Sequence, residues 1–167
     1  MRRLASLLLP VLLLSASCGG PSDPAELVKS GERSLGSQDF AAALRDFETA
    51  LQAIGGDTSH TSYVRAKLGE IEARASAGDA ARARTDLVAL ADAQPGTVSD
   101  ADFNRIVSRM GDTSKFREAV ALLQKGLELY PDSAHLDKLG KKLAADAEKA
   151  DDPEALEALK GMGYVGE

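Results

Sequence analysis

The sequence predicts an all-α protein, an α-α superhelix of about three to four stacked helical hairpins. Apolar residues recur at steps of three and four, which is the period of an amphipathic helix. Helix-opening and helix-closing residues recur at an interval in the middle thirties. Period-two alternation of useful length is nearly absent, so strands are not expected. At 167 residues, with 44% hydrophobic and 28% charged residues, the chain is able to bury one core or one short repeat array.

The first 17 residues have the order of an export signal. Arg2 and Arg3 are followed by a mostly apolar run of eleven residues, 4–14, and then by small residues. Cationic, apolar and small segments in this order are typical of a secretory signal peptide. Eleven helical residues reach only about 16 Å, whereas the hydrocarbon core of a bilayer is about 30 Å thick. We therefore assign residues 1–17 to a signal peptide and expect no permanent span there.

The single cysteine lies at the end of this signal. The stretch Leu14–Cys18 resembles the bacterial lipobox, in which small residues precede the cysteine that receives lipid. This resemblance implies acyl chains on Cys18, and two or more chains make a stable membrane anchor. The alternative is cleavage after Ser17 without lipid, which leaves a free cysteine. Residues 18–23, rich in Gly, Pro and Ser, are then a short linker of at most about 20 Å.

Net charge bears on both location and partners. The formal charge is −6, and it becomes −8 once Arg2 and Arg3 are removed with the signal. An acidic body is repelled by anionic lipid, so acyl chains rather than surface charge would hold it at a membrane. The same balance argues against a nucleic-acid partner, which needs a basic face. Gly19 carries no acidic retention signal for the inner membrane, which favours the periplasmic side of the outer membrane within the cell envelope.

Helix signals begin directly after the linker. Asp23 can accept the first backbone N–H bonds and Pro24 suits a first turn, so a helix is expected over 24–36. An apolar stripe predicts the next helix over 40–54, ended by two glycines. Helices over 62–77 and 80–93 follow, separated by Gly78-Asp79 and closed by a proline.

The second half repeats this alternation. Ser99 and the acidic residues after it cap a helix that we expect to run to Met110, with 111–113 breaking it. A stripe over 116–130 predicts another helix, because a proline closes it. Two more are expected, over 133–149 and 153–161.

The predicted second helix of each pair recurs at a regular interval. These helices begin at Phe40, Ala80, Phe116 and Pro153, at intervals of 40, 36 and 37 residues. Two helices per unit with this period indicate a repeat array in which each unit buries its apolar face only by stacking on its neighbours.

The segment 116–131 carries a family resemblance. It opens on Phe116, has Ala119 three residues on, Leu123 four further and Gly126 three further, and ends at a proline. This resembles the second helix of the tetratricopeptide repeat. Similar spacing occurs at Phe40, Ala43, Phe47 and Ala50, and Gly31 occupies the close-crossing position of the preceding helix. The resemblance covers 24–160 and leaves 161–167 as a C-terminal tail.

In tetratricopeptide arrays the first helices line a concave face that binds polypeptide partners, and the resemblance implies the same here. The candidate groove residues are Val28 and Glu32 in unit one, Arg65, Leu68 and Glu72 in unit two, Asn104 and Ser108 in unit three, and Lys138 and Lys142 in unit four. The alternative is that these are merely solvated residues of the first helices.

The sequence contains little that indicates a catalytic or metal-binding site. His60 lies close to Asp57 and Ser59, but neighbours in sequence do not give triad geometry, so a solvated loop is expected. His135 and Asp137 are two residues apart and do not share a helix face. One cysteine excludes a multi-cysteine metal site. We therefore expect no enzyme, no cofactor and no metal.

The expectation for function is an exported, lipid-anchored scaffold that mediates protein–protein interactions at the bacterial cell envelope. Its partner would be a protein or peptide, and its membrane contact would be the acyl chains on Cys18. One alternative is an envelope spacer that associates with copies of itself. The other is a small-molecule carrier or enzyme.

Overall fold

The computed structural model describes residues 23–166, and within them every regular element is an α-helix. The prediction of an all-α superhelix of helical hairpins is confirmed. The helices are α1 (Pro24–Gly36), α2 (Phe40–Ile54), α3 (Tyr63–Ser76), α4 (Ala80–Ala93), α5 (Asp100–Asp112), α6 (Phe116–Leu129), α7 (Ala134–Lys149) and α8 (Pro153–Gly161).

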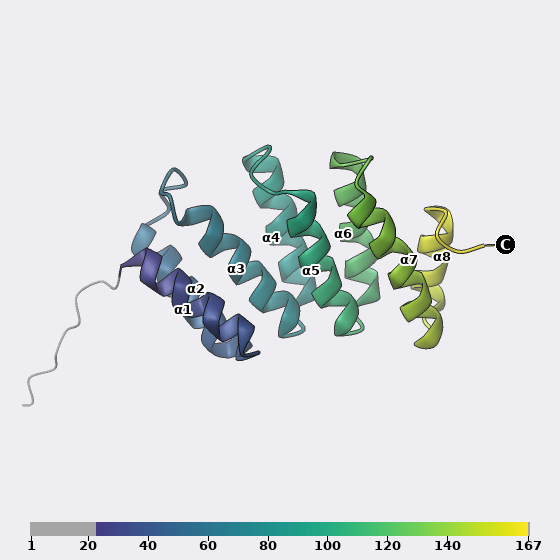
Figure 1. Cartoon of the computed structure of the whole chain (residues 1–167), viewed down its shortest axis with the longest axis horizontal. Coiled ribbons are helices and arrows are strands. Elements are labelled where there is room, and N and C mark those ends of the chain that lie inside the picture. The colour runs from purple at the N-terminus through teal and green to yellow at the C-terminus, as the bar shows by residue number, and fades with distance from the viewer. Residues whose placement is uncertain (1–22, 167) are drawn as a thin grey trace, which may run out of the picture.

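The helices form two layers. In Figure 1 the chain runs from α1 at the left to α8 at the right, with α3, α5 and α7 in front of α4 and α6. Each odd-numbered helix packs on the next odd-numbered one, and α4 packs on α6 and α6 on α8. The first helices of the hairpins thus form one continuous face, which we call the first-helix layer.

Local side-chain bonds set several helix starts. Asp23, Asp39 and Asp152 each accept a bond from a backbone N–H in the first turn of α1, α2 and α8. Ser99 and Asp102 form a reciprocal capping box at α5. These bonds satisfy N–H groups that have no partner inside the helix, which is why short polar residues mark the starts so clearly in the sequence.

The predicted end of α5 is wrong by two residues. The helix continues through Gly111 to Asp112 rather than stopping at Met110. Gly111 is buried, and a Cβ atom there would lie 2.9 Å from a methyl carbon of Leu143 on α7. The glycine therefore serves close helix packing, and the chain turns only at Ser114, which has a φ of 56°.

Buried side chains form two clusters. The smaller one surrounds Phe47 and joins α1, α2 and part of α3, and the larger one runs from α3 to α8. Tyr63 packs against both clusters. The first hairpin is therefore attached to the rest of the array chiefly through α3.

Ion pairs that involve α3 link it to both α2 and α4. α2 does not pack on α4 as α4 packs on α6. Instead, the nearly buried carboxylate of Glu70 on α3 pairs with Lys67 at 2.7 Å and with Arg74 at 2.8 Å. Arg74 also pairs with Glu48 of α2 at 2.6 Å, and Lys67 reaches Asp86 of α4 at 3.6 Å. Opposite charges thus replace apolar contact on this side of the first hairpin.

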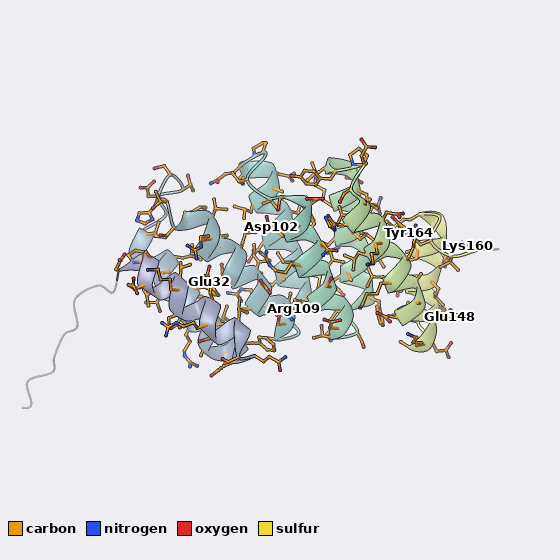
Figure 2. The ribbon with its side chains drawn as sticks, viewed as in Figure 1. Glu32, Asp102, Arg109, Glu148, Lys160 and Tyr164 are labelled. Atoms are coloured by element: carbon orange, nitrogen blue, oxygen red, sulfur yellow. The ribbon has the colours of Figure 1, made fainter. Side chains whose placement is uncertain are left out.

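The C-terminal residues belong to the packed body. Gly161 is the last residue of α8, and Met162, Tyr164 and Val165 then pack against the larger cluster. The ring of Tyr164 lies against Gly140 of α7, so closely that a side chain on this glycine would overlap the ring. Figure 2 shows Tyr164 beside the last two helices. The tail therefore covers the end of the array together with α8.

The predicted signal peptide and Cys18 lie outside the described residues. Within residues 23–166, none of the helices combines the length and apolar character needed to span a bilayer.

Candidate functional site

The first-helix layer carries two adjacent hollows. The first, of about 440 Å³, lies among α1, α3 and α5, and the second, of about 270 Å³, lies between α5 and α7. Eight of the nine predicted groove residues line them. The first hollow contains Glu32, Arg65, Leu68 and Glu72, and the second contains Asn104, Ser108, Lys138 and Lys142.

Val28 is the exception, and its prediction as a groove residue is wrong. Its side chain is only 1% exposed and belongs to the core around Phe47. Val28, Gly31 and Leu35 recur at steps of three and four and form the buried stripe of α1. Glu32 lies at the edge of that stripe and is exposed, so it alone represents α1 among the predicted residues of the groove.

The first hollow has an apolar floor. Leu35 and Leu68 line it together with the backbone of Gly36 and Gly69. Both leucines are more than nine-tenths buried, so the floor is firmly supported by the core beneath it.

Ion pairs surround this floor. Arg65 donates from one guanidinium nitrogen to both carboxylate oxygens of Glu32 at 2.7 Å. Arg105 pairs with Glu72 at 2.7 Å and with Asp102 at 2.9 Å. Glu32 and Arg65 connect α1 to α3, whereas Glu72 and Arg105 connect α3 to α5. The rim of the first hollow is therefore a chain of opposite charges across three helices.

Glu72 is the centre of this chain. Its side chain is 9% exposed; it forms an ion pair with Arg105 and accepts a hydrogen bond from Arg109 at 3.2 Å. The two arginines are four residues apart and so share one face of α5. Figure 2 shows Glu32 on α1 and Asp102 and Arg109 toward opposite ends of α5, on the layer nearest the viewer.

The second hollow is cationic. Lys138 and Lys142, four residues apart on α7, line it, and its other lining residues include no carboxylate. Lys142 donates to Asp146 at 2.8 Å and reaches Asp112 at 3.5 Å. The hydrogen bond to Asp146 raises the pKa of Lys142 above its ordinary value, so this ammonium stays charged at neutral pH. Among the described residues, Lys138 has no carboxylate within ion-pair distance.

Several lining residues were not predicted from the sequence. Asp102, Arg105 and Arg109 complete the first hollow, and His135 and Leu139 complete the second. The spacing of Arg105 and Arg109 shows that they share a helix face, but it does not show that this face meets Glu72. That pairing depends on the rotation of α5 against α3.

The loop of residues 57–62, which contains His60, forms hydrogen bonds among its own residues. Asp57 accepts hydrogen bonds from the backbone and hydroxyl of Ser59, and these bonds lower its pKa. The ring of His60 accepts from the backbone N–H of Ser62, immediately before α3. These contacts shape the turn into α3. Within residues 23–166, no group of three His, Cys, Asp or Glu side chains is placed to hold a metal ion.

Comparison of the chain with protein-family models, curated proteins and solved structures gives no match.

Proposed function

We propose that this protein is an exported, lipid-anchored scaffold that binds a segment of a partner protein across its first-helix layer at the bacterial cell envelope. The observation that carries this proposal is the pair of adjacent hollows that share α5 as their common wall. A single extended polypeptide is the kind of ligand that fills neighbouring hollows in one pass.

The ion pairs of the first hollow support this function through rigidity. The pairs of Glu32 with Arg65 and of Glu72 with Arg105 join neighbouring units across the face. A face held in shape before binding loses less conformational freedom when a partner docks, and this favours affinity. The exposed pair of Glu32 with Arg65 contributes little to overall stability, so its placement beside the hollow is better explained by a role in holding the shape of the hollow.

The N-terminal sequence supports the location. A signal peptide over 1–17 followed by a lipid-modified Cys18 would deliver the body outside the cytoplasm and keep it at a membrane. The periplasmic side of the outer membrane is the favoured place. The short linker would then hold the first hairpin close to the lipid surface, with the hollows on the same body.

Site-specific photocrosslinking in the producing cell tests this function. A photoreactive residue replaces Ser108, which lines the second hollow, or Gln124, which is exposed on α6 in the other layer. We expect an adduct with a second polypeptide from position 108 and none from position 124.

The two alternatives give different results. An adduct of the chain with its own copy from position 108 would favour the self-associating spacer. Equal adducts from both positions, or none from position 108, would contradict the scaffold. Binding or turnover of a small molecule that is lost on replacing His60 would favour the carrier or enzyme.

A further inference from the structure

The two hollows differ in the side chain that each favours. Around the first, every carboxylate and guanidinium has an opposite partner within the same hollow, so the rim carries no net charge. Its floor is formed by Leu35 and Leu68. Arginine side chains also offer flat faces on which rings stack. A large apolar side chain fits this hollow better than a charged one.

The second hollow favours an anion. Its lining includes two lysines and no carboxylate, although the whole chain is acidic, with a formal charge of −6. Asp112 and Asp146 both form ion pairs with Lys142. Among residues 23–166, the Lys138 ammonium has no carboxylate within ion-pair distance. The amide of Asn104 adds a hydrogen-bond donor at the same place. An acidic side chain entering here would meet complementary charge.

The wall between the hollows sets the spacing of the two side chains. Asp102, Arg105 and Arg109 face the first hollow from α5, whereas Asn104 and Ser108 face the second from the same helix. Packed helices lie about 8–10 Å apart, and an extended chain in the polyproline II conformation advances about 3.1 Å per residue and returns its side chains to the same side every three residues. Such a segment crossing α5 therefore needs about three residues to pass from one hollow to the next, and its side chains at those two positions both face the first-helix layer.

We propose that the groove recognises an extended polypeptide segment with a large apolar residue and an acidic residue three positions apart. The apolar side chain occupies the first hollow over Leu35 and Leu68, and the carboxylate meets Lys138 in the second. This inference rests on the proposed function and names the chemistry of its partner.

Synthetic peptides measure this preference directly. The probes are labelled Gly-Ser peptides that contain Phe-x-x-Asp or, in reverse order, Asp-x-x-Phe, with matched peptides in which Phe or Asp is Ala. Binding to the full-length protein in detergent is followed by fluorescence anisotropy. We expect one of the two orders to bind about tenfold more tightly than either single-anchor peptide at low salt, and the contribution of Asp to fall as salt rises.

Charge-reversal variants locate the acidic contact. Lys138→Glu should weaken the two-anchor peptide about tenfold, whereas Lys141→Glu should change its affinity less than about twofold. Lys141 is the matched control because it is exposed on the same helix but lies outside the second hollow, where it pairs with Asp137. Circular dichroism and unfolding midpoints confirm that both variants are folded.

A filling variant locates the apolar contact. Gly36 lines the first hollow, and a Cβ there would meet no atom within 4 Å. Gly36→Leu should weaken only the peptides that contain Phe.

Three results with the peptides and variants would overturn the inference, and a fourth concerns self-association. The first three are equal loss of affinity in the two lysine variants, equal binding of the Asp and Ala peptides, and no binding of any probe. In each case the proposed function would still be decided separately by photocrosslinking at position 108. Self-association that competes with the peptide would also overturn it, because the occupant would then be a second copy.

Discussion

The ring of Phe47 on α2 lies directly against the backbone of Gly69 on α3. Phe47 is fully buried, and Gly31 of α1 meets the same ring from another side, where a Cβ atom would be 2.8 Å from it. Three helices therefore converge on one aromatic ring, and two of them approach it through glycine. This contact is the apolar joint between the first hairpin and the rest of the array.

A side chain at position 69 should break this joint. Gly69→Ala should lower the free energy of unfolding by about 1–3 kcal/mol, because the added methyl overlaps the ring of Phe47 and forces the helices apart. Urea denaturation followed by circular dichroism measures the change. Gly36→Ala is the control, since it adds a methyl to open space at the end of α1 and should be neutral or stabilising by up to about 1 kcal/mol. Equal losses in the two variants would contradict the packing described for Phe47.

Removing the two arginines that pair with Glu72 should lower the free energy of unfolding more than removing the charge of Glu72 itself. Arg105→Met with Arg109→Met keeps aliphatic cover but leaves a carboxylate that is 9% exposed without its cations. This double variant should cost about 3 kcal/mol of unfolding free energy. Glu72→Gln should cost about 1 kcal/mol, because the arginines, 43% and 38% exposed, remain in contact with water. Equal costs in urea titrations would show that Glu72 does not depend on these arginines.

Tyr164 should make the stability sensitive to alkaline pH. Burial against the last helices raises the pKa of its hydroxyl above the ordinary value of 10.0, and Asp137 adds to this. The neutral phenol is therefore favoured in the folded state. The contribution of the neutral Tyr164 hydroxyl to the free energy of unfolding is fully present below pH 10 and is lost as pH rises through the raised pKa.

Comparison with Tyr164→Phe isolates this group. Above pH 10 the parent should lose more unfolding free energy than the variant, and ultraviolet titration of the variant should lack one component above the usual tyrosine range. Parallel losses of stability in the two proteins would contradict the buried position of Tyr164.

Lipid on Cys18 is tested by metabolic labelling. Cells that express the parent should incorporate labelled palmitate into the protein and retain it in the membrane fraction, because two or more acyl chains give a stable anchor. Cys18→Ser should lose the label and leave the membrane fraction. If the variant stays in that fraction, the lipid anchor is the wrong explanation for membrane attachment.

The positions of the helices were largely readable from the sequence. The residues that start and end a helix, such as Asp23 and Pro24, act within one or two turns of their own position. The apolar stripes that identify α2 and α6 also lie within single helices. Gly111 shows the limit of such local signals. Glycine can end a helix, or it can lie within the last turn and permit close packing there, and a neighbour far along the chain, Leu143, decides which.

The candidate site was predictable only in part. The resemblance to the tetratricopeptide pattern suggested first-helix positions such as Glu32 and Lys138, and the structure places both in hollows. Val28 is buried instead, because a rotation of a few tens of degrees about the axis of α1 separates a core position from a rim position. The contact of Tyr164 with Gly140 likewise gives the tail a packing role that its composition did not indicate.

By itself, the sequence determined that the chain is all helical, where its hairpins begin and end, and which residues resemble an export and lipid signal. Only the tertiary structure decided that Glu72 meets Arg105 and that one hollow is neutral while the next is cationic. The physical reason is the distance along the chain over which each interaction acts. Capping and periodicity depend on neighbours within a few residues, whereas the charge of a hollow depends on how far each helix is turned against the next.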